Sequence, residues 1–128
     1  MLFRSHLEKS KAPAVVIVSS VSGREVDFTG PAYGAFKAAL IHYAQRMAFE
    51  LAPKMIRVNA VSPGVIDTPI RAAMPEEARR DMLAKAAASL PVGRVGAGED
   101  IARQILGFMA NGFATGSIVY IDGGALVI

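Results

Sequence analysis

With 128 residues, 52% of them apolar and 20% charged, the chain has the composition of one folded domain spanning residues 1–128 and not of a disordered segment. It contains no cysteine, which excludes disulfides and thiolate metal sites and fits a cytoplasmic location, and no apolar run reaches the ~20 residues needed to cross a bilayer. The net charge is +3, but the basic residues are scattered and the two histidines lack partners at ligand spacing, so we expect no nucleic-acid partner, no membrane association and no metal site.

The start of the chain predicts a helix end followed by a buried strand. Residues 1–10 carry Leu2, Phe3 and Leu7 on what would be one apolar side of a helix. Residues 14–18 (Ala-Val-Val-Ile-Val) are uniformly apolar and mostly β-branched. Such a run is typical of a strand that is covered on both faces, as in a parallel sheet. Two serines follow this strand directly.

A loop and a long helix come next. Residues 19–31 contain glycines and a proline and predict a loop, and residues 32–51 predict the helix. Apolar side chains recur along this helix at spacings of three and four: Phe36, Leu40, Ile41, Ala44, Met47, Ala48 and Leu51. Pro53 ends the helix, and residues 56–61 (Ile-Arg-Val-Asn-Ala-Val) predict a second buried strand.

The last part of the chain predicts two further helices, over residues 75–88 and 99–109, and a third strand over residues 117–121. The glycines between the two helices do not have the dinucleotide-binding spacing and do not follow a strand, so we expect them to serve turns. The order strand, helix, strand, helix, strand predicts an α/β fold with a parallel sheet and right-handed crossovers.

One pair of side chains in the long helix suggests chemistry. Tyr33 and Lys37 are four residues apart, so they lie on one face of the helix about one turn apart. An ammonium group about 4 Å from a phenol stabilises the phenolate by roughly 4 kcal/mol at an effective dielectric constant of about 20, which favours proton transfer near neutral pH. Ser20, after the first strand, is placed to hydrogen-bond a substrate oxygen. Tyr and Lys at this spacing also occur in ordinary helices, so the pair gains weight only together with the serine.

These residues give the chain a family resemblance. Tyr33 follows Ser20 by thirteen positions and Lys37 follows Tyr33 by four. With this spacing the chain resembles the C-terminal half of a classical short-chain dehydrogenase/reductase. Three further segments match the family's pattern: Asn-Ala-Val-Ser-Pro-Gly-Val-Ile-Asp-Thr at 59–68, Pro-Val-Gly-Arg with the following Glu-Asp-Ile-Ala at 91–102, and Tyr-Ile-Asp-Gly-Gly at 120–124. The resemblance covers essentially the whole chain.

The resemblance implies the fold, the reaction and the cofactor. It implies a partial Rossmann-like, doubly wound parallel sheet made of the last three strands of the seven-stranded family fold. It also implies hydride transfer between NAD or NADP and a small alcohol or ketone substrate. Ser20, Tyr33 and Lys37 would be catalytic, and Tyr33 and Lys37 would also contact the cofactor together with Pro63, Gly64, Ile66 and Thr68. Residues 69–88 would form a lid over the substrate, and members of the family commonly form homo-oligomers.

The sequence departs from the family pattern in its first part. It contains no Thr-Gly-x-x-x-Gly-x-Gly turn and no catalytic Asn before the first strand, and Asn59 is on the wrong strand to replace that residue. We therefore expect a truncated domain that lacks the cofactor fingerprint, whose choice between NAD and NADP is unreadable. The strand at 14–18 would then be an edge strand with unpaired backbone groups.

Three functions remain open from the sequence. The first is an NAD(P)-dependent oxidoreductase that is inactive or weak as an isolated chain. The second is a non-catalytic module that uses the exposed edge and the helix at 32–51 to associate with itself or with another chain. The third is a relative of sugar-nucleotide epimerases or dehydratases, which share Tyr-x-x-x-Lys, although the Asp-Gly-Gly ending and the short length are against it.

Overall fold

The computed structural model describes residues 3–26 and 29–127. Its helices and strands are α1 (Arg4–Leu7), β1 (Ala14–Val18), α2 (Pro31–Leu51), β2 (Arg57–Pro63), α3 (Glu76–Ser89), α4 (Gly98–Ala110) and β3 (Ile118–Ile121). Four short 3-10 turns add η1 (Val21–Gly23), η2 (Ala52–Lys54), η3 (Pro69–Arg71) and η4 (Ala125–Val127).

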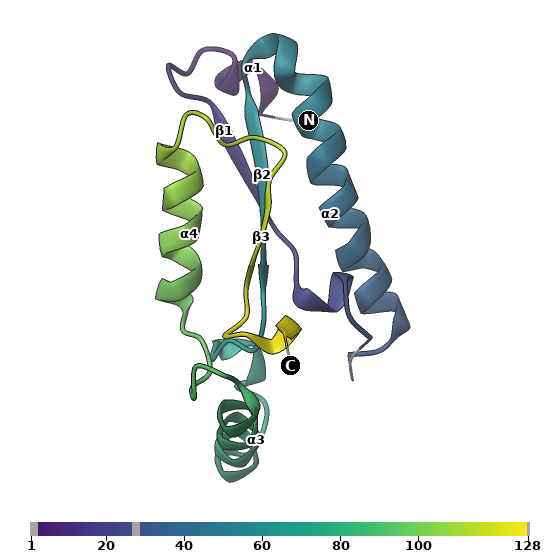
Figure 1. The fold of residues 1–128 in the computed structure, drawn as a ribbon, viewed down its shortest axis with the longest axis vertical. Helices are drawn as coiled ribbons and strands as arrows, with labels where there is room; N and C mark the ends of the chain where they lie inside the picture. Colours follow the sequence, from purple (N-terminus) through teal and green to yellow (C-terminus); the bar gives the residue numbers. More distant parts are fainter. Residues whose placement is uncertain (1–2, 27–28, 128) are drawn as a thin grey trace.

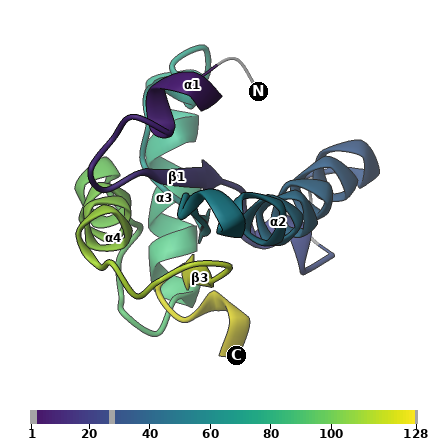
Figure 2. The same ribbon diagram turned by 90° about the horizontal axis from the view of Figure 1, so that it is seen from above.

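The strands form a three-stranded parallel sheet in the order β1-β2-β3. Helix α2 covers one face of the sheet and α4 covers the other, so the molecule has three layers (Figures 1 and 2). Helix α3 lies beyond the carboxyl ends of the strands, away from both layers (Figure 1). The α/β fold class predicted from the alternating pattern is confirmed.

The boundaries of the elements differ from the predicted ones by more than one residue at the first helix and at the end of the second strand. Helix α1 is a single turn, with Phe3 exposed before it and Leu7 packed against the core, while Leu2 lies outside the described residues. Strand β2 continues two residues further than predicted, because Ser62 and Pro63 pair with Tyr120 and Ile121 of β3. Considered alone, the Ser62-Pro63 pair favours a turn, but its pairing with β3 keeps it extended.

The core has two parts, one on each face of β2. Toward α2, the residues Ile56, Val58 and Ala60 are almost completely buried against Ala44, Ala48 and Leu51. Toward α4, a second cluster consists of Val61, Ile101 and Phe108. Strand β2 contributes to both clusters, with Val58 and Ala60 on one face and Val61 on the other. Its central position also buries two polar residues, Asn59 and Ser62.

The first strand lies at the edge of the sheet. Within the described part of the chain, β1 pairs with β2 on one side only, and Val18 at its end is 45% exposed. The expectation of an exposed edge at residues 14–18 therefore agrees with this sheet. None of the described helices is both long and apolar enough to span a bilayer.

Candidate active site

The predicted site residues come together at the carboxyl ends of the strands. Ser20 follows β1, Tyr33 and Lys37 lie in the first two turns of α2, and the segment 63–68 follows β2. In a parallel sheet these ends share one edge, where ligands of open α/β folds bind. One cavity of about 400 Å³ at this edge is lined by all seven predicted residues: Ser20, Tyr33, Lys37, Pro63, Gly64, Ile66 and Thr68.

Ser20 is held in a defined position by the turn that follows it. Its side chain is buried, its Oγ accepts a hydrogen bond from the Ser22 amide at 3.3 Å, and it lies 3.2 Å from the Ser22 hydroxyl. Ser20 thereby caps the short helix η1. The neighbouring Ser19 hydroxyl points elsewhere and donates to the Lys37 carbonyl at 2.7 Å, which ties the end of β1 to α2.

Tyr33 and Lys37 lie side by side, as their spacing requires. The Lys37 ammonium is 5.5 Å from the centre of the Tyr33 ring, and it also donates to the Val18 carbonyl at 3.3 Å. The ammonium thus occupies the space between the aromatic ring and the end of the edge strand. The Tyr33 side chain is 44% exposed, so its ring remains accessible from the cavity.

Two glycines allow the turn after β1 to approach α2 closely. A Cβ added at Gly34 would be 2.9 Å from the Ser22 carbonyl oxygen, and one added at Gly23 would be 2.8 Å from the backbone of α2. Both distances are shorter than side chains tolerate. The small residue next to Tyr33 therefore brings Ser20 and Tyr33 to the same cavity, a role that the sequence analysis did not assign.

The segment after β2 is fixed by backbone contacts on two sides. The Gly64 amide donates to the Ile121 carbonyl at 3.0 Å, and a Cβ at Gly64 would be 2.8 Å from the Asp122 Cα. The glycine is therefore required by the close approach of the turn after β3. On the other side, Ile66 forms an isolated parallel bridge with Gly96. Gly96, between α3 and α4, thus supports the segment that lines the cavity, while Gly98 lies in the first turn of α4.

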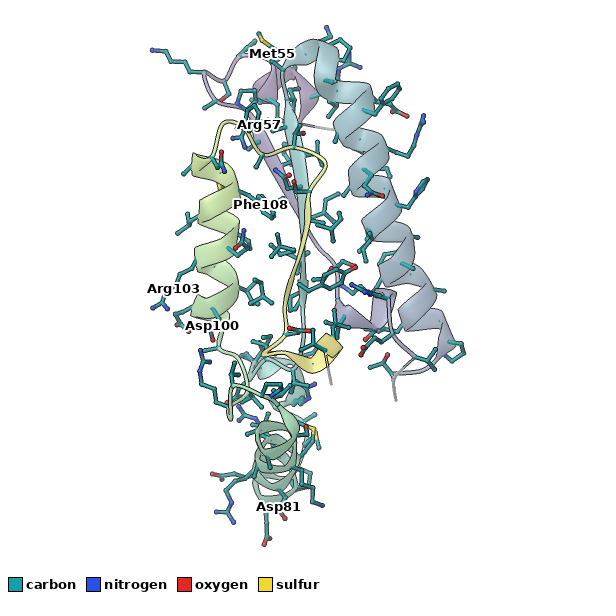
Figure 3. The ribbon with its side chains drawn as sticks, in the orientation of Figure 1. Met55, Arg57, Asp81, Asp100, Arg103 and Phe108 are labelled. Carbon is teal, nitrogen blue, oxygen red and sulfur yellow. The ribbon has the colours of Figure 1, made fainter. Side chains whose placement is uncertain are left out.

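Helix α4, which forms one wall of the site, is held at its start by an exposed ion pair. Both Asp100 carboxylate oxygens accept from Arg94, at 2.7 and 2.9 Å, and one also accepts from the Ala97 amide at 2.8 Å. These hydrogen bonds, the one from Arg94 above all, hold the pKa of Asp100 well below its usual range. The carboxylate also compensates the positive end of the helix (Figure 3).

Several residues of the cavity escaped the sequence analysis. Val18, Ile70, Arg71, Gly98 and Ile101 line it together with the predicted residues. The sequence analysis places Arg71 only within the lid at residues 69–88. Its position directly after the matched segment 59–68 was a signal that could have singled it out.

The charge of the cavity is one-sided. Lys37 and Arg71 are the charged side chains that line it, and among its described lining residues there is no carboxylate. The described part of the chain also contains no group of three or more His, Cys, Asp or Glu side chains placed to hold a metal ion.

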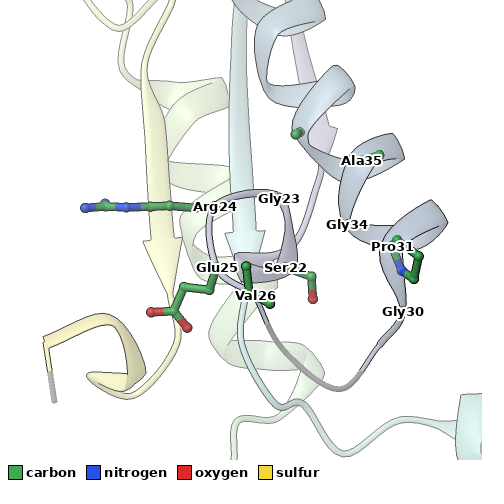
Figure 4. Close-up of a pocket in the computed structure, with 10 residues that line it drawn as sticks. Ser22, Gly23, Arg24, Glu25, Val26, Gly30, Pro31, Gly34 and Ala35 are labelled. Carbon is green, nitrogen blue, oxygen red and sulfur yellow. The ribbon is translucent and has the colours of Figure 1, made fainter.

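A second hollow of about 400 Å³ lies on the other side of η1, between this turn and the start of α2 (Figure 4). Small residues line it, among them Gly23, Gly34 and Ala38. Arg24 extends from its rim toward β3, where its guanidinium lies 5.3 Å from the centre of the Tyr120 ring. None of the predicted site residues borders this hollow.

The sequence matches a known family over nearly its whole length. A family model described as enoyl-(acyl carrier protein) reductase matches residues 3–125. The chain is 38% identical to the 3-oxoacyl-(acyl-carrier-protein) reductase FabG of Thermotoga maritima over 125 residues, which are 95% of this chain and 49% of that protein. It is 36% identical to cis-4-hydroxycyclohexanecarboxylate dehydrogenase of Sinomonas cyclohexanicum, over 93% of this chain and 47% of the relative.

Solved structures agree with these sequence matches. A small-chain dehydrogenase in complex with NADPH superimposes with a TM-score of 0.87 at 34% identity, over 93% of this chain and 53% of that one. ElxO with NADP bound gives a TM-score of 0.82 at 30% identity, over 97% of this chain and 50% of that one. The chain therefore spans about half the length of the curated relatives and solved structures that it matches.

Proposed function

The chain belongs to the short-chain dehydrogenase/reductase family, and from this we propose that it takes part in hydride transfer between a nicotinamide cofactor and an alcohol or carbonyl substrate. The observation that carries the proposal is the convergence of Ser20, Tyr33 and Lys37 on one cavity. The names of the two relatives above, a reductase and a dehydrogenase, fit this class of reaction.

In the proposed reduction, the protein residues position the substrate and move the proton. The Ser20 hydroxyl hydrogen-bonds the carbonyl oxygen of the substrate, which holds the carbon beside the cofactor. The reduced nicotinamide, when bound, supplies the hydride. As the carbonyl becomes an alkoxide, the Tyr33 phenol transfers its proton to that oxygen, and the Lys37 ammonium stabilises the phenolate that remains. Oxidation of an alcohol uses the same groups in reverse.

The residues present fit the nicotinamide half of the cofactor. Ile66 and Ile101 give the cavity an apolar wall suited to a flat ring, and the Thr68 hydroxyl offers a partner for a carboxamide. The Lys37 ammonium would hydrogen-bond ribose hydroxyls. We propose Pro63, Gly64, Ile66 and Thr68 as cofactor contacts on this basis. The choice between NAD and NADP stays open. NADPH and NADP are bound in two of the similar structures, but this chain covers only about half of each.

Replacing Tyr33 by phenylalanine tests the proposed proton transfer. We expect turnover with NAD(P)H to fall by at least ~100-fold, because loss of a general acid typically costs 10²- to 10⁴-fold. Tyr43→Phe is the matched control, since Tyr43 lies on the same helix and is similarly exposed (51%). The sequence contains no Thr-Gly-x-x-x-Gly-x-Gly turn, so we expect low wild-type turnover. If calorimetry shows no NAD(P)H binding and no turnover is detected, the enzymatic proposal fails for this chain.

A second candidate is a module that associates with itself or with another chain. The observation in its favour is the outer face of α2, where Phe36, Tyr43 and Phe49 are 61%, 51% and 74% exposed. The edge of β1 that has no strand partner in the described part of the chain adds to this surface. Light scattering over a range of concentrations tests it. We expect a dimer or higher oligomer that is weakened by Phe36→Glu but not by Phe113→Glu, a change at a phenylalanine outside α2 that is 99% exposed. A monomer at all concentrations would contradict this candidate.

A further inference from the structure

We propose that Arg71 recognises an oxoanion, a carboxylate or phosphate, on the molecule that occupies the cavity, and we assign this group to the substrate. The inference rests on the proposed function, because it names a substrate class for that site. It would make the substrate an acidic alcohol or carbonyl compound and Arg71 a residue that determines specificity.

The first argument is the position of Arg71. It lines the cavity described above, and it also lines an adjoining cavity of about 410 Å³ that shares Ser20, Tyr33 and Ile70 with the first. The adjoining cavity contains the serine and tyrosine assigned to the substrate oxygen and lacks the side chains of Lys37, Ile66 and Thr68. An anion held by Arg71 there would belong to a molecule whose reacting oxygen faces Ser20 and Tyr33.

The second argument is the state of the guanidinium. Nη1 of Arg71 donates to the Ile66 carbonyl at 3.1 Å, and this is the only hydrogen bond that the side chain makes to the described residues. A guanidinium carries five N–H donors, so most of them remain available. The side chain is partly buried, and the bond to Ile66 limits its freedom before any ligand arrives.

The third argument is the absence of a neutralising partner. Neither cavity is lined by a carboxylate among its described residues, whereas Arg79, on α3, is paired with Asp67. A partly buried cation without a counter-ion attracts an anion, and arginine matches the two oxygens of a carboxylate or phosphate with parallel N–H groups. The apolar part of the cavity, which includes Val65 and Ile70, would hold the remainder of the substrate.

The test is a binding measurement by calorimetry on the whole chain, with two matched pairs of probes. The first pair is 3-hydroxybutyrate and its methyl ester, which differ in the carboxylate. The second pair is nicotinamide mononucleotide and nicotinamide riboside, which differ in the phosphate. We expect the wild type to bind the acid about tenfold more tightly than the ester, with a preference that falls as salt is added.

The variants separate recognition of charge from a structural role. Arg71→Gln should abolish the preference for the acid while leaving ester binding within about twofold, and Arg71→Lys should restore part of it. Arg80→Gln, an exposed change on α3, is the control and should preserve it. An Arg71→Gln chain that loses acid and ester binding equally would show that the side chain only holds the loop, and would overturn the inference.

The remaining outcomes also decide between the sources of the anion. A charge preference confined to the nucleotide pair would assign Arg71 to the cofactor and overturn the substrate assignment. Equal affinity of the wild type for the acid and the ester, or no binding of either, would also overturn the substrate assignment. Tyr33→Phe should keep the acid preference, because it removes a proton donor and not a cation. A chain that prefers the acid through Arg71 but neither binds nor uses NAD(P)H would support the anion site while the proposed function fails.

Discussion

At the scale of single residues, the site depends on the absent side chain of a glycine as well as on the reactive groups. Gly34 stands between Tyr33 and the rest of α2, although glycine is a poor helix former. Its lack of a side chain lets the Ser22 carbonyl approach the helix. The placement of Ser20 beside Tyr33 therefore depends on the small size of Gly34, a residue that takes no part in the proposed chemistry.

We expect Gly34→Ala to destabilise the fold by about 1–3 kcal/mol, because the added methyl group would overlap the backbone of η1. Gly107→Ala is the matched control, since the nearest atom to its added Cβ is a flexible Gln104 side-chain nitrogen at 3.9 Å. That change should stabilise the chain by up to about 1 kcal/mol, as expected for alanine in an open helix. Thermal and urea unfolding measure both. Equal effects of the two changes would contradict the steric explanation.

Asp100 supplies a pH-dependent part of the stability. Its pKa is lowered in the folded state, so its contribution is fully present above the usual Asp pKa of about 4 and is lost as the pH falls below that value. We therefore expect Asp100→Asn to lower the melting temperature at pH 7, and the difference from the wild type to shrink at pH 3. A difference that stays constant between these two pH values would refute the assignment.

The site residues show how far the sequence carries such a prediction. The order and spacing of Ser20, Tyr33 and Lys37 could be recognised because each follows a fixed structural landmark, the strand end or the helix start. Arg71 could not, because its importance comes from the cavity that it lines and not from a local pattern. The same holds for Gly34, whose neighbour in space is twelve positions away in the sequence.

At the scale of elements, α4 is fastened at both ends. Asp100 caps its first turn, and Arg57, from the start of β2, binds the carbonyl oxygens at its last turn (Figure 3). The Arg57 Nη1 donates to Phe108 at 2.6 Å and to Asn111 at 2.8 Å, and Nη2 donates to Met109 at 2.9 Å. One side chain thus satisfies carbonyl groups that the helix itself leaves without partners.

Replacing Arg57 by methionine should lower the free energy of unfolding by about 2 kcal/mol, because several charge-assisted hydrogen bonds are lost together. Lysine at this position should recover only part of the loss, since an ammonium group cannot reproduce the fork. Arg46→Met, which removes an exposed ion pair with Glu50, serves as the control and should cost less than about 1 kcal/mol. Urea unfolding measures all three, and a similar loss for Arg46→Met would contradict the prediction.

The elements were predicted well where periodicity is long, and less well where it is short. The helices at 32–51 and 99–109 correspond to α2 and α4 within one residue at each end. Residues 1–10 carry too few apolar positions to define a helix length, and α1 is one turn. The apolar spacing in α2 predicted the helix but not which of its apolar side chains are buried. Ala44 and Ala48 are buried, while Phe36 is 61% exposed.

At the scale of the whole molecule, the sheet has a well protected centre and an open edge. Strand β2 has a neighbour on both sides and a core cluster on both faces. Among the described residues, strand β1 has a neighbour on one side. The relatives that the chain matches are about twice as long, so the three strands described here correspond to only part of their fold.

We expect this asymmetry to appear in amide hydrogen exchange. The β2 amides, such as those of Val58 and Ala60, should exchange most slowly, through global unfolding. The β1 amides that face away from β2 should exchange faster by at least about tenfold, because they have no strand partner among the described residues. Equal protection of both strands would show that another segment or chain covers the edge in solution.

The parallel pairing of the strands has a further consequence, for the kinetics of folding. Ala14 pairs with Arg57 and Ala60 pairs with Ile118, so every contact of the sheet joins distant parts of the chain and none can form as a local hairpin. Chains with such high contact order fold slowly for their size, since loop closure must precede the contacts that reward it. Helix α2, whose contacts within itself are local, is expected to form first and to provide the surface on which β1 and β2 meet.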